Sequence, residues 1–272
     1  MIFNGRAFAR ERLRVLQEAR KEFGPLSIGI VVSSSDPVTS SYIKIKERNA
    51  QALDISLVRY VVPDHATLRE ALDAVAAAST HDGVIVQLPL PNDIPADEVL
   101  DAMPPEKDLD VISLSGSERF AGGRHPIMPP VASAINEIID AHDIMVQGKK
   151  VVVVGKGKLV GLPAYHLMRF RGASVQSLDH DDTLAPSVKD ADILILGAGS
   201  PHLITPDMVK EGVVVFDAGT SESGGVVVGD ADPAVAEKAS FFTPVPGGIG
   251  PVAVVEIFAN LLTLVGSHAG SR

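Results

Sequence analysis

The sequence contains no cysteine among its 272 residues, which excludes disulfide bonds, thiolate nucleophiles and cysteine-ligated zinc. It also lacks a basic surplus, because its 34 acidic residues outnumber its 24 lysines and arginines and the formal net charge is -10. Nucleic-acid binding is therefore disfavoured, since that function normally requires a positive surface. No apolar run reaches the roughly 18 residues of a membrane-spanning helix. We therefore expect a cytoplasmic protein with neither nucleic-acid nor membrane partners.

What the sequence does contain is an alternation of strand and helix patterns. The apolar runs that predict buried strands are 26–32, 57–62, 83–88, 150–154, 174–178, 193–196 and 213–216. The periodic segments that predict helices are 37–50, 67–78, 131–142, 163–171 and 252–265. Alternation of this kind predicts parallel sheets covered by helices, which is an α/β fold.

The segment 103–123 interrupts this alternation with paired prolines, glycines and charges. It is too long for a simple turn, so we predict an irregular functional loop or a domain junction. We expect two α/β domains with a cleft between them, the second a Rossmann-type parallel sheet. The first domain comprises 1–126 plus 252–272, and the second comprises 127–251.

A glycine-rich turn follows the strand predicted at 150–154. Its pattern is Gly155-x-Gly157-x-x-x-Gly161, one residue longer than the usual dinucleotide fingerprint. Glycine lets the backbone approach a pyrophosphate, and the following helix N-terminus supplies N–H groups and a positive dipole end. The alternative is a tight strand–helix turn without a ligand.

Charged residues around this turn favour different cofactors. Asp179 ends the next predicted strand, where an acid commonly accepts from the ribose 2′-hydroxyl of NAD and repels the 2′-phosphate of NADP. Lys156 and Lys158 favour NADP, because either could pair with a phosphate. Asp179 could also belong to a solvated acidic loop. The predicted cofactor is therefore NADP or NAD, and we expect NAD to be used at least as well as NADP.

The first half carries candidate reactive groups. Tyr42 and Lys46 are four residues apart on one predicted helix and share a face. Such a pair can orient a substrate and move a proton if burial tunes the lysine, although a surface pair is the alternative. Gln87 closes an apolar strand at the end where ligands bind to parallel sheets. Its amide could hydrogen-bond a lysine or a substrate carbonyl, or it could pair with backbone.

Two further segments have unusual composition. One carboxylate of the run Lys107–Asp110 could bind the adjacent N–H donors of an amino-pyrimidinone edge, and a solvated charge run is the alternative. Thr243–Pro251 is TPVPGGIGP, whose prolines and glycines fix a stiff backbone without bulky side chains. That backbone suits close approach to a flat ring, and a rigid connection into the last helix is the alternative.

Seven segments together resemble the bifunctional methylenetetrahydrofolate dehydrogenase/methenyltetrahydrofolate cyclohydrolase (FolD) family. They are SDPVTSSYIKIK, DGVIVQLPLP, PPEKDLD, VVVVGKGKLVGLP, ADILILGAGSP, VVGDAD and TPVPGGIGP. They occur in family order over nearly the whole chain, and VQLPLP and TPVPGGIGP are highly specific.

The resemblance implies roles for individual residues. Lys46 would be the catalytic lysine of the cyclohydrolase step, Tyr42 would orient the folate, Gln87 would hold the lysine, and Asp110 would anchor the pterin-like ring. The backbone of Thr220 would meet the nicotinamide end. The implied substrate-binding residues are Tyr42, Val86, Gln87, Leu88, Asp110, Pro246, Gly247, Gly248, Ile249 and Gly250. The implied cofactor-binding residues are Gly155, Lys156, Gly157, Val160, Gly161, Gly219 and Thr220, to which the chemistry of an acid at the strand end adds Asp179. No metal ligands are implied.

The implied reaction is hydride transfer from 5,10-methylenetetrahydrofolate to NAD or NADP, followed by hydrolysis of the methenyl product to 10-formyltetrahydrofolate. The implied partners are one-carbon derivatives of tetrahydrofolate and a second copy of the chain, in a homodimer formed through the cofactor domain. A shikimate-type small-acid dehydrogenase and a diverged folate- or nucleotide-binding regulator without turnover are the alternatives.

The chain departs from the family pattern at four places. Val111-Ile112 follows Asp110 where the family usually has Gly-Phe, and Ile127-Met128-Pro129 stands in place of Cys-Thr-Pro. Gly155-Lys156-Gly157 replaces Gly-Arg-Ser, and Asp179 replaces a histidine.

Overall fold

The computed structural model describes residues 1–33, 37–91, 93–179, 182–223 and 226–269, without the side chains of 37–42, 222–223 and 268–269. The chain divides into two compact units. Unit 1 comprises Met1–Arg10 and Val131–Ala253, and unit 2 comprises Glu11–Pro130 and Val254–Arg272. Each unit has its own parallel sheet with helices, so the predicted α/β class is confirmed.

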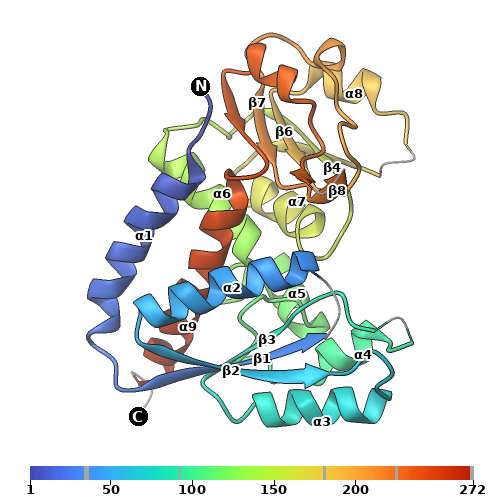
Figure 1. Ribbon diagram of the computed structural model, residues 1–272. Coiled ribbons are helices and arrows are strands. Elements are labelled where there is room, and N and C mark those ends of the chain that lie inside the picture. The colour runs from blue at the N-terminus through green and yellow to red at the C-terminus, as the bar shows by residue number, and fades with distance from the viewer. Residues whose placement is uncertain (34–36, 92, 180–181, 224–225, 270–272) are drawn as a thin grey trace. The chain divides into compact units, whose positions relative to one another are not determined.

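Unit 2 is built on a three-stranded parallel sheet in the order β2-β1-β3. The strands are β1 (Leu26–Ser33), β2 (Ile55–Val62) and β3 (Gly83–Val86). Helices α2 (Pro37–Ala52) and α3 (Leu68–Ala78) cover opposite faces of this sheet (Figure 1). Because helices lie on both faces, β3 is buried along its whole length.

The segment after β3 is more regular than the sequence predicts. We expected an irregular stretch over 103–123, but α5 (Leu114–Ala121) lies there, after the short helix α4 (Ala96–Asp101). Ser113 caps α5, because its hydroxyl accepts a hydrogen bond from the backbone N–H of Gly116. The expectation was wrong because a cap and tertiary burial, rather than a long apolar pattern, stabilise this helix of eight residues.

Unit 1 contains a five-stranded parallel sheet in the order β10-β7-β6-β4-β5. In chain order its strands are β4 (Lys150–Val154), β5 (Ser174–Leu178), β6 (Ile193–Leu196), β7 (Val214–Asp217) and β10 (Phe241–Thr243). The chain steps from β4 outward to β5 and then back across β4 to β6, so the direction of the crossovers reverses beside β4. In open α/β sheets, ligands bind at such a switch point, outside the carboxyl ends of the strands. The expected Rossmann-type sheet is confirmed.

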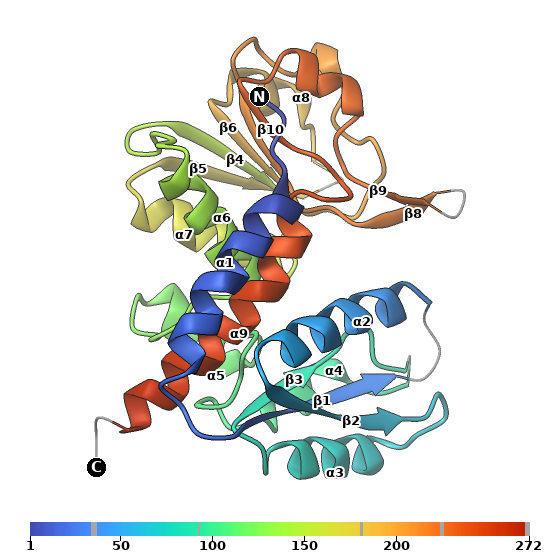
Figure 2. The same ribbon diagram turned by 60° about the vertical axis from the view of Figure 1, so that its left-hand side comes forward.

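Helices and a hairpin complete unit 1. The connections β4–α7–β5 and β5–α8–β6 run in opposite directions across the sheet, so the right-handed rule for such crossovers places α7 (Gly161–Phe170) and α8 (Ala185–Asp190) on opposite faces. The antiparallel hairpin of β8 (Ser221–Ser223) and β9 (Val226–Val228) projects from the rest of this unit (Figure 2). The remaining elements are α6 (Pro130–Ala141) and the 3-10 turns Pro206–Met208 and Pro233–Glu237.

The first residues of the chain pack into unit 1. Ile2 forms a parallel bridge with Phe242 of β10. The ring of Phe3 lies 5.7 Å from that of Phe241 and 5.4 Å from that of His142, measured between ring centroids. Helix α1 (Gly5–Arg20) therefore begins from an anchored N-terminus.

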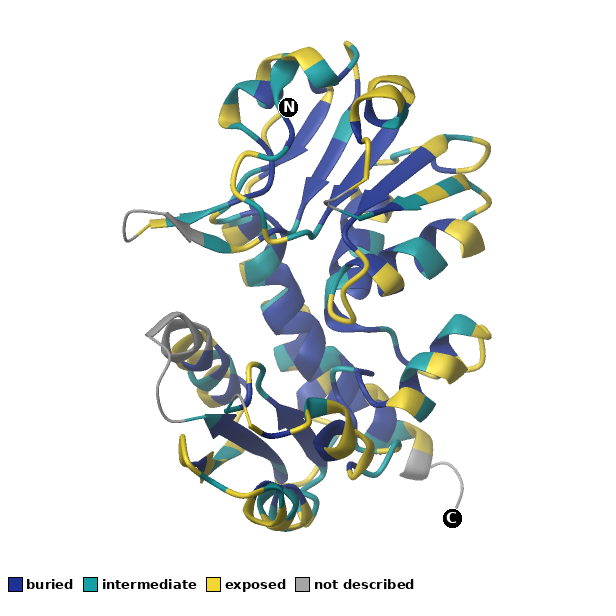
Figure 3. Ribbon diagram, turned by 90° about the vertical axis from the view of Figure 1, so that its right-hand side faces the viewer, coloured by how far each residue is buried: buried dark blue, intermediate teal, exposed yellow. Residues whose placement is uncertain are grey.

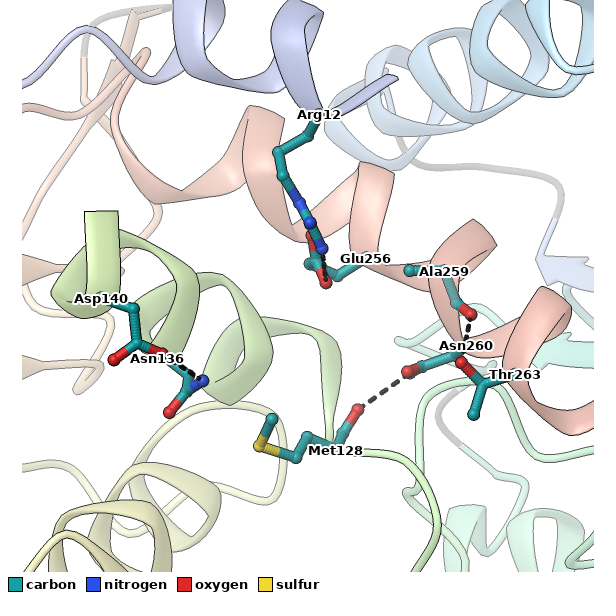
Figure 4. Close-up of polar contacts among 8 residues, drawn as sticks. All are labelled: Arg12, Met128, Asn136, Asp140, Glu256, Ala259, Asn260 and Thr263. Atoms are coloured by element: carbon teal, nitrogen blue, oxygen red, sulfur yellow. Dashed lines mark hydrogen bonds and ion pairs between the residues drawn. The ribbon is translucent and has the colours of Figure 1, made fainter. Parts of the chain in front are cut away.

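The last helix, α9 (Ile249–Ala269), is apolar and largely buried (Figure 3). Its stretch Ile249–Ser267 is long and apolar enough to cross a membrane, so the prediction that no apolar run reaches this length was wrong; it is the one such stretch among the described residues. However, 67% of it is buried within the protein, as in a core helix. Glu256 of α9 is also ion-paired, because Nε and Nη2 of Arg12 donate to its two carboxylate oxygens at 3.0 and 3.1 Å (Figure 4).

Candidate functional site

Lys46 and Gln87 meet at the C-terminal end of β3 in unit 2. Lys46 lies on α2, and its Nζ donates a hydrogen bond of 2.8 Å to Oε1 of Gln87, the residue after Val86 of β3. Nε2 of Gln87 donates to the backbone oxygen of Leu88 at 2.9 Å, which turns the amide oxygen toward the lysine. Tyr42 precedes Lys46 by one turn of α2, but its side chain lies outside the described residues.

Burial and a nearby acid set the charge of Lys46. Only 7% of this residue is exposed, and burial lowers the pKa of its ammonium, while Asp110 opposes part of the lowering. Burial also raises the pKa of Asp110 to about 6, which Lys46 opposes and Asp108 reinforces. A lysine with a lowered pKa can exchange a proton at lower energetic cost near neutral pH. The arrangement can therefore bind an N–H edge at Asp110 and move a proton at Lys46.

Lys107 and Asp108 are structural residues rather than solvated charges. Nζ of Lys107 donates to the backbone oxygens of Ser79 and His81, at 2.7 and 2.8 Å, just beyond the end of α3. Asp108 is fully buried, and its Oδ2 accepts from the backbone N–H of Ser113 at 2.9 Å. Both contacts fix the chain immediately before the half-buried Asp110.

Backbone pairing with β3 holds the segment that carries Asp110. The N–H of Val84 donates to the backbone oxygen of Lys107 at 2.7 Å, and the N–H of Leu109 donates to the oxygen of Val84 at 3.2 Å. Val111 follows Asp110 with a φ of 53°, a left-handed conformation that a β-branched residue rarely adopts. It stands where the similar family usually has glycine, the residue best suited to this conformation.

The glycine-rich turn of unit 1 has the geometry of a phosphate-binding turn. Gly155 has a φ of 101°, and a side chain there would collide with Gly197. A side chain at Gly161, the first residue of α7, would collide with the backbone oxygen of Gly155. By contrast, a Cβ at Gly157 would meet no described atom within 4 Å, and Val160, the N-cap residue of α7, makes no side-chain cap hydrogen bond. The open backbone before α7 therefore suits an anionic group.

Asp179 and Lys156 both interact with a third residue, Asp182. Asp179 directly follows Leu178, whose backbone oxygen accepts from the N–H of Gly155 at 2.8 Å, so Asp179 lies beside the turn. The N–H of Asp179 donates to Oδ2 of Asp182 at 2.7 Å. Nζ of Lys156 lies 3.8 Å from that same oxygen. Lys156 is thus already paired with an acid of this chain.

Gly219 and Thr220 follow β7, next to two buried acids. The N–H of Gly219 donates to Oδ1 of Asp217 at 2.9 Å, and a side chain at Gly219 would collide with the carboxylate of Asp230. Asp217 is 1% exposed and Asp230 is 0% exposed, whereas Thr220 is exposed. The backbone around Thr220 is therefore held by buried carboxylates.

The segment TPVPGGIGP forms the turn that starts α9. The Val245–Pro246 peptide bond is cis, and Gly247 has a φ of 103°. A side chain at Gly248 would come within 2.5 Å of the backbone oxygen of Pro244. Ile249–Gly250 are the first residues of α9. The glycines leave this backbone without side chains that could shield it.

The structure thus brings Lys46, Gln87 and Asp110 together, but sequence reasoning missed three buried residues near the candidate groups: Asn260, Asp217 and Asp230. Nδ2 of Asn260 donates to the backbone oxygens of Leu109 and Met128, at 2.9 and 2.8 Å, and the second bond is drawn in Figure 4. An asparagine inside an otherwise apolar helix was the available signal, because a buried amide needs partners.

Comparisons with known proteins cover nearly the whole chain. Residues 3–110 match the catalytic domain of tetrahydrofolate dehydrogenase/cyclohydrolase, and residues 129–269 match its NAD(P)-binding domain. The chain is 36% identical over 278 residues to the Bifunctional protein FolD of Lactobacillus delbrueckii subsp. bulgaricus, covering 99% of this chain and 98% of that relative.

Two solved structures are similar to the chain over its full length. The bifunctional enzyme FolD-methylenetetrahydrofolate dehydrogenase/cyclohydrolase from Campylobacter jejuni has a TM-score of 0.93 and 28% identity, covering 98% of this chain and 99% of that one. The N5,N10-methylenetetrahydrofolate dehydrogenase-cyclohydrolase (FolD) from Trypanosoma brucei, complexed with NADP cofactor and inhibitor, also has a TM-score of 0.93 and 28% identity. That match covers 99% of this chain and 98% of the other.

Proposed function

The chain belongs to the tetrahydrofolate dehydrogenase/cyclohydrolase family, and from this premise we propose that it oxidises 5,10-methylenetetrahydrofolate and hydrolyses the product to 10-formyltetrahydrofolate. The observation that carries the proposal is the buried Lys46, hydrogen-bonded to Gln87 and electrostatically coupled to Asp110. A lysine kept out of water with a lowered pKa can make the proton transfers of the hydrolytic step.

In the oxidation, a C–H bond of the one-carbon bridge breaks and the hydrogen leaves with both electrons. Bound NAD or NADP supplies the acceptor for this hydride. The folate is left as the 5,10-methenyl cation. The step depends on the alignment of two rings more than on an acid or base. Asp110 would hold the pterin N–H edge, and the backbone of Pro246–Gly250 would lie against the folate.

In the hydrolysis, the oxygen of water forms a bond to the methenyl carbon and one proton of that water must leave. The bond from this carbon to N5 then breaks as N5 takes up a proton and the new hydroxyl loses its remaining proton, so the formyl group stays on N10 and one proton is released overall. We assign the proton transfers to Lys46, since its lowered pKa makes both protonation states accessible. Gln87 holds Nζ in place through the 2.8 Å hydrogen bond.

The dinucleotide would lie on the glycine-rich turn of unit 1. A φ of 101° at Gly155, the open position at Gly157 and the uncapped start of α7 suit a pyrophosphate. Asp179 would accept from the ribose 2′-hydroxyl of NAD, and Lys156 would meet the 2′-phosphate of NADP. Gly219 and Thr220 would lie at the nicotinamide end.

We further propose that two copies associate through unit 1. Leu159, Leu162 and Phe170, in and just before α7, are 45%, 44% and 51% exposed. Helix α7 packs beside β5, an edge strand of its sheet. An exposed apolar group of this kind favours association. Sedimentation of the wild type and of Leu162→Glu tests this, and a dimer that the variant leaves unchanged would contradict it.

Unit 2 would then supply Lys46, Gln87 and Asp110 to the folate, and unit 1 would hold the dinucleotide, in a cytoplasmic enzyme. Turnover of 5,10-methylenetetrahydrofolate with NAD and with NADP tests the proposed function. Formation of reduced cofactor followed by 10-formyltetrahydrofolate supports it. Binding of folate without turnover would instead indicate a regulator.

A further inference from the structure

Asp217 and Asp230 form a buried pair of carboxyl groups at the carboxyl end of the unit 1 sheet. Asp217 is the last residue of β7, and Asp230 lies two residues beyond β9. Together they accept six backbone hydrogen bonds. The residues whose backbone N–H groups donate to Asp230 are Ala198, Gly199 and Ser200, at 2.6, 3.2 and 2.8 Å. Those that donate to Asp217 are Gly219, Asp230 and Ala231, at 2.9, 3.3 and 2.9 Å.

These bonds join three separate loops. The loop of 198–200 follows β6, the loop of 218–220 follows β7, and 229–231 follows β9. Side chains at Gly219 and Gly229 would collide with the carboxylates of Asp230 and Asp217. The loops are therefore folded directly around the two acids, and neither carboxylate can move without displacing backbone.

In the part of the chain that the structure describes, backbone N–H groups rather than a cation stabilise this pair. The charged group that acts on Asp217 is Asp230, and the groups that hold Asp230 are the backbone N–H groups of Ala198, Gly199 and Ser200. Burial raises the pKa of both carboxyls, that of Asp217 to about 7. Two buried carboxyls carry a desolvation cost that their six backbone hydrogen bonds offset only in part, since the pKa of both stays raised. Perturbed acids at the ligand-binding end of a parallel sheet are typical of functional sites.

We propose that Asp217 and Asp230 are positioning residues for hydride transfer. They fix the backbone around Thr220 and make unit 1 bind the oxidised cofactor more tightly than the reduced one. The inference rests on the proposed function, since Thr220 stands at the expected nicotinamide end. The oxidised nicotinamide ring is a cation and the reduced ring is neutral. A buried negative pair nearby therefore stabilises the oxidised form more than the reduced form.

The test compares Asp217→Asn and Asp230→Asn with Asp207→Asn, an exposed aspartate of the same unit that accepts from the hydroxyl of Thr205. An amide keeps the size of the side chain but loses the charge and one acceptor oxygen. Both buried-site variants should lose roughly tenfold or more in the kcat of the dehydrogenase step. Hydrolysis of 5,10-methenyltetrahydrofolate, which uses Lys46 of unit 2, should change by less than about twofold in all three.

The affinities for NAD and NADH separate this role from a merely structural one. The preference for NAD over NADH should fall by about three- to tenfold in both buried-site variants and stay unchanged in Asp207→Asn. If the variants fold, as thermal unfolding shows, and keep both the dehydrogenase kcat and this preference, the inference is wrong. Equal loss of dehydrogenase and cyclohydrolase activity would also overturn it.

A measurement on the wild type keeps the inference testable if the variants do not fold. As pH rises from about 6 to about 8, the pair gains negative charge, so the preference for NAD over NADH should rise by about three- to tenfold. A preference independent of pH would overturn the inference. A failure of the proposed function would appear separately, as no turnover of 5,10-methylenetetrahydrofolate by the wild type.

Discussion

Nζ of Lys46 and Oε1 of Gln87 are 2.8 Å apart and joined by a hydrogen bond, although the two residues lie on different elements of unit 2. The amide accepts without adding charge, so it holds the ammonium while leaving the lowering of its pKa to burial. A carboxylate in the place of Gln87 would have raised that pKa and kept the lysine protonated.

Lys46→Met should abolish hydrolysis while sparing hydride transfer. The variant removes the proton-transfer group, so the kcat for hydrolysis of 5,10-methenyltetrahydrofolate should fall by roughly 10²- to 10⁴-fold. The dehydrogenase kcat should fall by less than about tenfold, because that step needs alignment rather than a base. Initial rates of the two half-reactions provide the measurement.

The matched control is Lys44→Met, an exposed lysine on the same helix, which should leave both rates near the wild-type values. Equal loss of both activities in a Lys46→Met protein with unaltered thermal unfolding would argue against a specific proton role.

Asp110→Ala should weaken folate binding selectively. Pterin N–H donors that lose their acceptor cost about 1–3 kcal/mol, so the Kd for folate should rise by roughly five- to 150-fold. The Kd for the nicotinamide cofactor should barely change. Calorimetric titration measures both, with Glu106→Ala, an exposed acid of the same loop, as the control. Unchanged folate affinity would exclude this role for Asp110.

The pKa of Asp110 adds a dependence on pH. It is raised to about 6, so the carboxylate that accepts from the pterin is present above that pH and is lost as pH falls through it. Folate affinity should therefore weaken below about pH 6 in the wild type. Asp110→Ala should remove this part of the pH dependence, and an identical profile in the two proteins would contradict the assignment.

Apolar patterning predicted the two parallel sheets because strands such as β1 and β6 are buried on both faces, which leaves a continuous apolar run. It did not predict that Ile2 pairs with Phe242, because that bridge joins opposite ends of the chain and no local pattern encodes it. Helix α5 was missed for a related reason, since its cap and its packing, rather than periodicity, stabilise it.

The residues of the candidate site likewise divide into those that local sequence patterns predict and those that they do not. The spacing of Tyr42 and Lys46 and the strand-end place of Gln87 are local features, so sequence reasoning could single them out. Asp230 lies in the segment VVGDAD, but nothing in the sequence gives it or Asp217 a role, because the role proposed for them depends on burial and on backbone donors from distant loops. Buried acids of this kind become visible only in the structure.

The left-handed conformation of Val111 predicts that a glycine variant is more stable than an alanine variant at this position. In regular structure the order is the reverse, because alanine normally gives a free energy of unfolding about 0.5–1 kcal/mol higher than glycine. At Val111, with a φ of 53°, a Cβ is strained, so Val111→Gly should be more stable than Val111→Ala by about 1 kcal/mol. Urea unfolding measures the difference. As a control, Ala76→Gly, at an exposed position of α3, should lower the free energy of unfolding. If Val111→Ala is more stable than Val111→Gly, the turn relaxes without strain and the prediction is wrong.

Cofactor choice should depend on the competition for Lys156. Its Nζ lies 3.8 Å from Oδ2 of Asp182, and that oxygen is also held by the N–H of Asp179, so a 2′-phosphate would have to displace an acid that is already in place. At about 4 Å and an effective dielectric near 20, one like charge costs on the order of 4 kcal/mol before screening, and a single lysine is a point charge rather than a bidentate clamp. We therefore expect the kcat/KM for NAD to equal or exceed that for NADP.

Asp182→Asn should release Lys156 and move the ratio of the two kcat/KM values toward NADP by about three- to tenfold. Lys189→Ala, which changes an exposed lysine of α8, should leave this ratio unchanged. A wild-type preference for NADP of about tenfold or more would mean that Lys156 outweighs both acids; Lys156→Ala should then erase the preference and Asp179→Ser should leave it unchanged.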